Sequence, residues 1–511
     1  MSASKDKIVR RQLKDEGLDK RALAKAKEEK ERRASTRKYT IVAVVLVLFF
    51  AFIFIYNSSL PARLTTAVTV NGEKYSAAEL NYYYSNAYQT YYQNYYYYFY
   101  LGYGPFDTDT PLDEQEYADG QTWHDYFLES AVDTLTQVQM LNEAAEAAGF
   151  TLSAEEQAEY EESVAEFETA WEDYGYSSLK QFVALVYGDG VTPELAETEM
   201  YRMTVASAYA QQVYDDFEYS AEELAAYYEE NAASYNEIEY AYCALETTVY
   251  ADDETAEALA DTMTDSLAAE AEAAVAALNG TDFATFEAYA SEQLGGTAYE
   301  TSSTADYLST LYSEWLQDES RVAGDVAYFE EEDGCVDIVM YLGLNTNDYK
   351  LASFRHLLVE AVDADEDGAY SDDEVAAAEE LANTYYAEWQ AGAADEDSFA
   401  ELANTYSEDT GSNTTGGLYE DVYQGQMVTP INDWLFEDGR AAGDTAVLTY
   451  NEGGSYTGTH VVYYVGESDM TYADSLADSA LREEDYSAWS EEQLAGYTAV
   501  TSHLGLCGDN Y

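Results

Sequence analysis

The chain of 511 residues has 100 acidic and 23 basic residues, a net charge of −77, and 47% of its residues are hydrophobic. So negative a chain repels nucleic acids, and we therefore expect no nucleic-acid partner. The hydrophobic content excludes a wholly disordered chain, and the length predicts about two to four domains.

The basic residues gather at the N-terminus, before an apolar stretch. Residues 1–38 hold 14 of the 23 Lys and Arg, and residues 39–58 contain an almost unbroken apolar run. About 20 apolar residues cross a bilayer, and basic flanks stay on its cytoplasmic side. The pattern predicts a cytoplasmic segment over 1–38, a single-pass cell-membrane anchor over 39–58 and an extracytoplasmic bulk. A cleaved signal peptide is the alternative, but no clear small-x-small cleavage site follows the run.

Residues 66–235 form a predicted helical domain that opens with a β-hairpin. Residues 68–75 have Asn-Gly at the turn, and Ser76 with Glu79 fits a capping box that starts a helix. Twelve tyrosines lie in residues 82–103. One helix cannot bury rings on every side, so we expect some of them to be exposed. An exposed tyrosine surface would suit unfolded clients; the alternative is that tyrosine simply replaces Leu and Phe in the core.

Two later segments resemble each other. Residues 315–325 and 434–444 share a Trp-Leu pair and an Arg-x-Ala-Gly-Asp turn at identical spacing. Their flanking strands also align, so we predict two copies of one module that combines strands and helices, over 236–346 and 350–467. Residues 468–511 are expected to form a C-terminal helix and a free tail. The predicted fold class is therefore α+β.

The second module carries several separated motifs in order. It has His356 in its first strand, Asp409 in a Ser-x-Asp loop, Met427 in a Gly-Gln-Met segment and His460 in its last strand. These motifs resemble the parvulin family of peptidyl-prolyl cis/trans isomerases, and the resemblance implies that both modules are α/β with small antiparallel sheets. The Val-Asn-Gly-Glu hairpin before a helix resembles the chaperone domain of PrsA-like and SurA-like extracytoplasmic foldases, whose helical domain is similar to that of trigger factor.

The resemblance implies roles for the site residues. His356, Asp409 and His460 would form the catalytic centre. The residues that would contact the substrate are Leu418, Met427, Ile431, Phe436 and Thr457. Rotation about an X-Pro bond has a barrier of about 18–20 kcal/mol, because the twisted amide loses its conjugation. A site lowers this barrier when it binds the twisted amide more tightly than the planar forms, and this requires no cofactor.

Several positions depart from the family pattern. Val428 and Ile431 stand where many relatives have Gln and Phe, which weakens the prediction of fast turnover. In the first module the two histidine positions are occupied by Tyr242 and Asp337. We therefore interpret residues 236–346 as a degenerate copy with a binding or spacer role.

One acidic loop fits the calcium pattern D-x-D-x-D-G-x5-E. Its ligands would be Asp363, Asp365, Asp367, Ser371 and Glu374. A strand rather than a helix precedes this loop, and Ser371 with Glu374 also fits a capping box. Calcium is therefore the weaker interpretation, and we expect no other metal and no cofactor.

The sequence predicts a membrane-anchored peptidyl-prolyl isomerase and foldase that acts on unfolded, proline-containing secreted or cell-wall proteins. Two alternatives stay open: a holding chaperone without isomerase activity, and a tyrosine-rich surface or adhesive protein. Whether the chain forms a homodimer also stays open.

Overall fold

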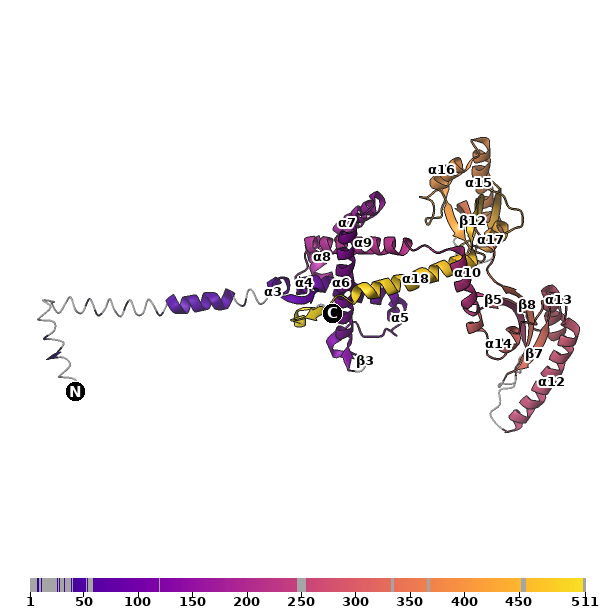
Figure 1. Cartoon of the computed structure of the whole chain (residues 1–511), viewed down its shortest axis with the longest axis horizontal. Helices are drawn as coiled ribbons and strands as arrows, with labels where there is room; N and C mark the ends of the chain where they lie inside the picture. The colour runs from indigo at the N-terminus through magenta and orange to yellow at the C-terminus, as the bar shows by residue number, and fades with distance from the viewer. Residues whose placement is uncertain are drawn as a thin grey trace. The chain divides into compact units, whose positions relative to one another are not determined.

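The computed structural model describes residues 58–118, 120–245, 254–331, 335–364, 368–451 and 456–508, together with 40–51, 53 and isolated positions among the first 38. Its contacts divide the chain into two compact units (Figure 1). The first unit contains Met1–Phe217 and Asp485–Tyr511, and the second contains Glu218–Glu484.

The first unit is mainly helical. Its helices are α3 (Leu60–Leu64), α4 (Ala77–Asn94), α5 (Tyr96–Tyr100), α6 (Trp123–Ala148), α7 (Ala154–Asp173), α8 (Leu179–Val186), α9 (Pro193–Asp215) and the end of α18 (Tyr472–Leu494). Its strands are β1 (Thr66–Val70), β2 (Glu73–Ser76), β3 (Glu116–Ala118), β4 (Gln121–Thr122) and β13 (Ala499–Thr501). Strands β13, β1 and β2 form one sheet in that order, and β3 pairs with β4.

The predicted hairpin and capping box are both present. Asn71 and Gly72 have φ angles of 49° and 93°, which turn the chain between β1 and β2. The Ser76 side chain accepts a hydrogen bond from the Glu79 backbone N–H, and the Glu79 carboxylate accepts one from the Ser76 N–H. The Asn-Gly pair and the capping box therefore set the start of α4.

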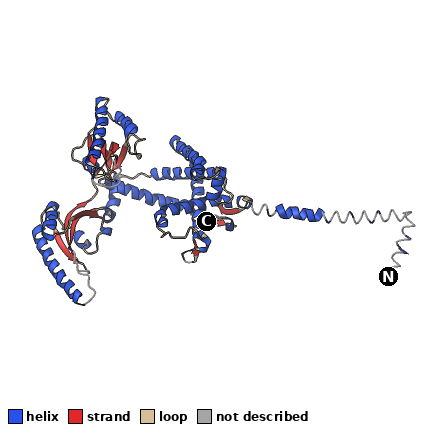
Figure 2. Ribbon diagram, turned by 180° about the vertical axis from the view of Figure 1, so that it is seen from behind, coloured by secondary structure: helices blue, strands red, loops and turns tan. Residues whose placement is uncertain are grey.

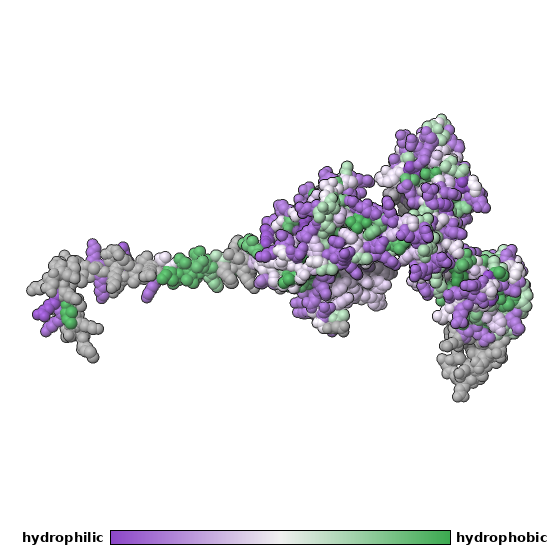
Figure 3. Space-filling model, in the orientation of Figure 1, coloured by the Kyte–Doolittle hydropathy of each residue, from purple (hydrophilic) through white to green (hydrophobic). Residues whose placement is uncertain are grey.

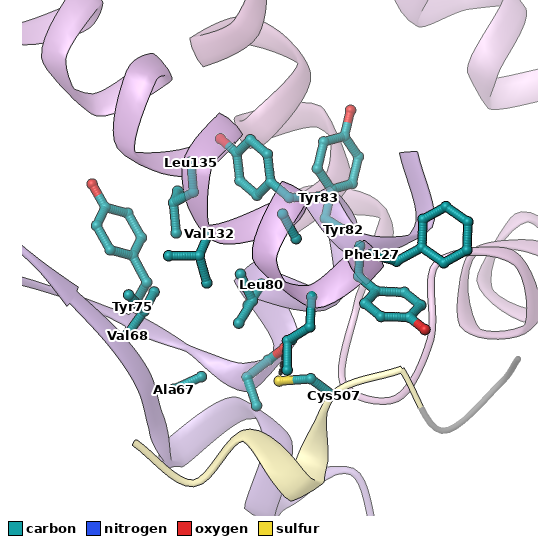
Figure 4. Close-up of a cluster of buried hydrophobic side chains, with 14 of the residues drawn as sticks. Ala67, Val68, Tyr75, Leu80, Tyr82, Tyr83, Phe127, Val132, Leu135 and Cys507 are labelled. Atoms are coloured by element: carbon teal, nitrogen blue, oxygen red, sulfur yellow. Dashed lines mark hydrogen bonds between the residues drawn. The ribbon is translucent and has the colours of Figure 1, made fainter. Parts of the chain in front are cut away.

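The predicted free tail is wrong for the residues that the structure describes. Strand β13 pairs with β1, and the Ser502 N–H donates to the Ala67 carbonyl over 2.7 Å. Cys507 then enters the core of the first unit, where it is 1% exposed (Figure 4). Short strands of this kind have weak sequence patterns, because their pairing is decided by the partner strand.

Tyrosines make up part of the same core. Tyr82 and Tyr83 lie with Leu80, Phe127 and Leu135 in one cluster of buried side chains (Figure 4). Tyr83 is 1% exposed and its hydroxyl donates to the Glu199 carboxylate over 2.7 Å, which satisfies a polar group that burial would otherwise leave unpaired. The start of α4 is thus core, while the tyrosines of α5 are exposed, as predicted for part of the run.

The second unit contains two small sheets covered by helices (Figure 2). The first sheet has β5 (Glu237–Leu245), β6 (Tyr299–Ser303), β7 (Val326–Glu330) and β8 (Val336–Asn345), with α12 (Glu254–Leu278), α13 (Phe283–Tyr289) and α14 (Ser313–Leu316). The second has β9 (Lys350–Glu360), β10 (Leu418–Val422), β11 (Thr445–Tyr450) and β12 (Gly458–Thr471), with α15 (Asp372–Ala391), α16 (Glu396–Tyr406) and α17 (Thr429–Leu435).

The predicted boundary at residue 235 lies instead at 217. Helices α10 (Ala221–Glu230) and α11 (Ala232–Tyr235) belong to the second unit. The Asn347 amide donates to the Tyr228 hydroxyl over 3.1 Å and to the Tyr235 carbonyl over 2.9 Å. These bonds join the helices to the chain between β8 and β9, a contact that no local sequence pattern indicates.

The two sheets share their strand order and their register. The orders are β6-β5-β8-β7 and β10-β9-β12-β11, and all neighbours are antiparallel. Tyr242 pairs with Val339 in the first sheet as His356 pairs with Val462 in the second. In each central strand pair the register then shifts at the same distance from these pairs. The shift lies between Tyr341 and Gly343 in β8 and between Tyr464 and Gly466 in β12. The repeat seen in the sequence thus corresponds to a repeated register.

The repeated turn has the same contacts in both modules. The Gly324 N–H donates to the Tyr341 carbonyl over 2.8 Å, and the Gly443 N–H donates to the Tyr464 carbonyl over 2.8 Å. Arg440 stacks over Trp434 at 4.1 Å from the ring centroid. In the first module the Arg321 guanidinium stacks over Trp315 at 4.9 Å in the same way. The shared Trp, Arg and Gly residues therefore hold equivalent turns against the sheets.

Part of the apolar N-terminal run is helical. Residues 40–51 are helical and exposed, and they form a hydrophobic stretch (Figure 3). Among the residues that the structure describes, no helix is both long and apolar enough to span a bilayer. Residues 39, 52 and 54–57 of the predicted anchor lie outside the described part of the chain.

Candidate active site

One face of the second sheet carries two histidines. His356 is on β9 and pairs with Val462, while His460 is on the adjacent strand β12 and pairs with Leu358. Paired residues and residues two apart share a face, so both imidazoles lie on the same side. Helices α15 and α16 cover the other face, where Leu357, Val461 and Phe399 are fully buried. Helices α15 and α16 therefore do not cover the face that carries the histidines, and a ligand can approach the sheet from that side.

The two imidazoles contact each other directly. Their rings are nearly parallel, with centroids 5.3 Å apart, and Nδ1 of His356 lies 3.1 Å from Nδ1 of His460. On the outer side, Nε2 of His356 lies 2.8 Å from Oδ2 of Asp409. On the inner side, the Tyr456 hydroxyl lies 3.1 Å from Nε2 of His460. The four side chains form one continuous hydrogen-bonded row.

Asp409 is held by several donors at once. Its Oδ2 accepts hydrogen bonds from the Ser412 hydroxyl and, over 3.0 Å, from the Tyr419 hydroxyl. Its Oδ1 accepts the Gly411 N–H over 3.2 Å. The bond from His356, with those from Ser412 and Gly411, holds the pKa of the Asp409 carboxyl well below its usual range. Asp409 is therefore an ionised acceptor at neutral pH.

The His460 imidazole is neutral. It is 1% exposed, and burial lowers its pKa to about 3, with the neighbouring His356 as a smaller cause. Burial also raises the pKa of Tyr456 to about 12, and it raises the pKa of Tyr419, where the Asp409 charge adds to it. Both phenols therefore keep their protons and can donate.

These states fix the direction of each hydrogen bond when both imidazoles are neutral. Ionised Asp409 requires the proton on Nε2 of His356, which makes Nδ1 of that ring an acceptor. His460 must then donate from its own Nδ1, so its Nε2 accepts from the Tyr456 hydroxyl. If the histidine pair gains a proton, the bond between the two imidazoles and the bond between His460 and Tyr456 can both reverse. The Tyr456 hydroxyl then accepts from Nε2 of His460. Tyr456 is thus a partner for His460 in either state.

A close backbone approach places the Asp409 loop against β9. The His356 N–H donates to the Gly417 carbonyl over 2.8 Å. A Cβ at Gly417, whose φ is +70°, would lie 2.0 Å from the His356 carbonyl oxygen. Only glycine therefore allows β10 to reach His356, and this explains the Gly-Gly pair that precedes the strand.

Comparison with known proteins shows which kind of domain contains this site. Residues 356–463 match the family model described as Rotamase, the PPIC-type PPIase domain. This range begins at the first histidine and contains the second. The chain carries a parvulin-type peptidyl-prolyl cis/trans isomerase domain. No curated protein matches the chain.

Several solved structures are similar to the chain at low identity. The isomerase PrsA of Bacillus anthracis is 19% identical, with a TM-score of 0.19, over 29% of this chain and 59% of that one. PrsA of Bacillus subtilis is 12% identical, with a TM-score of 0.28, over 73% of this chain and 86% of that one. A SurA-like chaperone structure from Campylobacter jejuni is 11% identical, with a TM-score of 0.18, over 84% of this chain and 95% of that one. This chain thus spans less than two thirds of the Bacillus anthracis protein.

The isomerase domain has an apolar wall beside the histidines. Met427, Val428 and Phe436 are partly buried against a cluster that includes Phe354 and Val462 on the histidine face. Ile431 belongs to the same cluster but has no exposed surface. Met427 and Phe436 therefore keep some exposed surface, whereas Ile431 lies wholly within the cluster.

Two predicted contact residues lie elsewhere. Leu418 pairs with Arg355 and so takes the face opposite to the histidines, whereas Tyr419 pairs with Phe354 and takes the histidine face. The Tyr419 ring meets the His356 ring at 79° with centroids 5.2 Å apart. Thr457 is 4% exposed, and the hydroxyl at His460 belongs to Tyr456. The register of each strand, offset by one residue from our prediction, accounts for both differences.

Sequence reasoning missed Ser412, Tyr419 and Tyr456. A signal existed for two of them. Ser412 follows Asp409 by three residues, a spacing at which short side chains bond locally, and Tyr456 precedes His460 by an even number of positions in an extended segment.

The acidic loop after β9 is only partly described. Asp365 and Asp367 lie outside the described residues. Asp363 accepts the Gly368 N–H over 2.9 Å, and Glu374 accepts hydrogen bonds from Ser371, as its capping box requires, and from the Ala364 N–H. Over the part of the chain that the structure describes, no three His, Cys, Asp or Glu residues group as metal ligands.

Proposed function

We propose that the chain is an extracytoplasmic foldase that accelerates cis/trans exchange at X-Pro bonds of unfolded secreted or cell-wall proteins. The observation that carries this proposal is the row Tyr456–His460–His356–Asp409 on a sheet face that the PPIC-type match contains. The row offers no free nucleophile for covalent chemistry. It offers neutral and anionic hydrogen-bonding groups of fixed orientation beside an apolar wall.

This arrangement fits the energetics of prolyl rotation. The twisted amide loses conjugation, and its nitrogen and carbonyl differ from the planar forms in charge and direction. A site accelerates exchange when it holds the twisted form more tightly than either planar form. Met427 and Phe436 would hold the proline ring, while the hydrogen-bonded row would orient donors and acceptors around the rotating carbonyl.

Membrane attachment is part of the proposal. Residues 39–58 contain an almost unbroken apolar run, 14 of the 23 basic residues precede them, and the rest of the chain is strongly acidic. This charge distribution supports an N-terminus in the cytoplasm and a bulk outside. A protease-protection assay on membrane vesicles, with a truncated chain that begins at residue 59 as the control, tests this placement.

Isomerase activity is tested by exchange spectroscopy on a proline peptide. The chain should accelerate cis/trans exchange, and the variant with His356→Ala and His460→Ala should lose that acceleration. His503→Ala is the matched control, because His503 is exposed and lies outside the domain. No acceleration by the intact, folded chain would overturn the enzyme proposal.

A holding function is the second candidate. The exposed tyrosines of α5 favour it, because aromatic rings on a surface bind flexible chains with little loss of side-chain entropy. In an aggregation assay the double histidine variant would then protect a client as well as the unaltered chain does.

A further inference from the structure

The first unit presents a concentrated group of exposed aromatic rings. The aromatic surface, as we call it, consists of the exposed tyrosines of α5 and the turn after it: Tyr96, Tyr97, Tyr98, Tyr100 and Tyr103. Their exposed fractions are 57, 67, 55, 75 and 77%. Monomeric proteins rarely leave so many large rings of one short segment in solvent, so the surface requires an explanation.

A buried support holds this surface in place. Phe99, the one inward-facing ring of α5, stacks on Tyr92 with centroids 4.8 Å apart and meets Phe106 at 4.9 Å. Phe106 in turn contacts Trp123 at the start of α6, with centroids 4.9 Å apart. The exposed rings therefore stand on a packed aromatic base, and a ligand that binds them need not order the segment first.

The sequence on either side of the aromatic surface carries acidic residues and no Lys or Arg. No Lys or Arg occurs between Lys74 and Lys180. The loop that follows Tyr103 is rich in exposed acids: Asp107, Asp109, Asp113, Glu114 and Glu116. Gln115 orders this loop, because its amide donates to the Asp107 carbonyl over 2.8 Å and to the Thr110 carbonyl over 2.7 Å. Phe106 anchors the same loop against the base of α5.

We propose that the aromatic surface binds unfolded polypeptide segments that carry Lys and Arg. The inference rests on the foldase function proposed above and defines which clients the first unit selects. Tyrosine faces attract ammonium and guanidinium groups, and the adjacent carboxylates add a Coulombic attraction for the same groups. The aliphatic stems of Lys and Arg also cover ring surface, which a Glu-rich segment cannot do without charge repulsion.

The charge of the chain points to the same partner. With a net charge of −77, the protein repels acidic segments and attracts basic ones. That general attraction is not confined to one place, whereas the tyrosines add a local, short-range preference. The proposal therefore predicts a selectivity that survives at an ionic strength of about 0.15 M, where the Debye length is about 8 Å.

The test compares three unstructured peptides of equal length and equal aromatic and proline content. They carry Lys and Arg, Gln, or Glu at the same positions, and their affinity for the full-length chain is measured by fluorescence anisotropy. The test variant is Tyr97→Leu, Tyr100→Leu, Tyr103→Leu, which keeps apolar area but removes the rings. The matched control is Tyr174→Leu, Tyr299→Leu, Tyr307→Leu, whose rings are 72, 55 and 86% exposed elsewhere.

We expect the basic peptide to bind most tightly. The test variant should lose about two- to fivefold in affinity for that peptide per ring removed, and little for the Gln peptide. The control variant should bind all three peptides as the unaltered chain does. An unchanged ratio of basic to Gln affinities in the test variant would overturn the proposal, and so would equal losses in the control variant. Competition by a wall polysaccharide but by none of the peptides would overturn it too.

The failure of this proposal can be told apart from failure of the isomerase proposal. Binding is repeated in the variant with His356→Ala and His460→Ala, whose prolyl exchange is measured in parallel. Retained selectivity for the basic peptide supports the aromatic surface whatever the exchange rate shows. Loss of selectivity in this variant, with the tyrosines intact, would place the basic-peptide site in the isomerase domain and overturn the assignment.

Discussion

The Tyr456 hydroxyl lies 3.1 Å from Nε2 of His460, at the opposite end of the hydrogen-bonded row from Asp409. The Tyr456 ring also meets the His460 ring at 73°, with centroids 5.9 Å apart. A phenol at this position can donate to a neutral imidazole or accept from a protonated one. It therefore holds the ring in place without fixing its protonation state.

Removal of this hydroxyl should loosen His460. In Tyr456→Phe we expect prolyl exchange to slow by about fivefold, which corresponds to the loss of one hydrogen bond of about 1 kcal/mol. Nitrogen NMR of the imidazoles should show a mixture of His460 tautomers where the unaltered chain shows one.

The matched control for that experiment is Tyr463→Phe. Tyr463 lies on β12 with His460 but faces the helices, where it packs against Phe399 with centroids 5.6 Å apart. The control should keep a single His460 tautomer and the original exchange rate. A single tautomer in Tyr456→Phe would show that the histidine pair is oriented by other contacts.

Asp409 is the ionised carboxylate at one end of the row, and four donors converge on it. The Asp409→Asn substitution keeps the shape but places an amide N–H₂ against these donors. We expect kcat/KM on a proline peptide to fall by about ten- to hundredfold, because at least one buried donor loses its acceptor. Asp433→Asn on α17, an exposed position, is the control. Equal activity of the two variants would contradict the role assigned to Asp409.

The sequence predicts the residues of the hydrogen-bonded row better than it predicts the register of the strand next to it, β10. Both histidines and Asp409 come from family motifs, and strand alternation places the histidines on one face. Leu418 and Tyr419 could not be told apart, because the pairing of β10 with β9 begins after a Gly-Gly turn and is irregular between Tyr419 and Val422. A shift of one residue exchanges the two faces, and only the structure shows the register.

Long-range contacts explain the remaining differences. Strand β13 and Cys507 return to the first unit across more than 400 positions in the chain, as the contact of Cys507 with Ala77 shows. No local pattern in residues 499–508 indicates that partner. The start of α4, in contrast, depends on neighbours within three residues, Ser76 and Glu79, and was predicted from them.

The neutral His460 gives the stability of the isomerase domain a pH dependence. Its pKa is lowered by burial to about 3 from an ordinary value of 6.5. Between these values the unfolded chain binds a proton that the folded chain does not, so stability falls as pH falls through that window. From pH 7 to pH 5 this group alone should remove about 2 kcal/mol of the free energy of unfolding.

The measurement compares urea unfolding at pH 7 and pH 5 in two variants. In His460→Asn the pH-dependent loss should be smaller than in the unaltered chain by about 2 kcal/mol. In His503→Asn, which changes an exposed histidine outside the domain, the loss should match that of the unaltered chain. The many carboxylates of the chain titrate in all three proteins and cancel in the comparison. An identical loss in His460→Asn would show that His460 is protonated in the folded state.

Under the proposed function, the apolar wall divides into residues that would contact substrate and residues that would support them. Ile431 has no exposed surface, whereas Met427 is partly exposed above the same cluster. Ile431→Ala should lower the free energy of unfolding by about 2–4 kcal/mol, because it leaves a cavity in packed surroundings. Ile431→Val should cost about 1 kcal/mol and keep the KM for a proline peptide.

Met427→Ala should affect KM more than stability, the reverse of what we expect for Ile431→Ala. It removes surface that the proline ring would contact, so KM should rise severalfold while stability changes less than in Ile431→Ala. Urea unfolding and exchange spectroscopy on the same samples give both quantities. A rise in KM for Ile431→Val at unchanged stability would show that Ile431 contacts the substrate, because only a direct contact responds to one methyl group without a loss of packing energy.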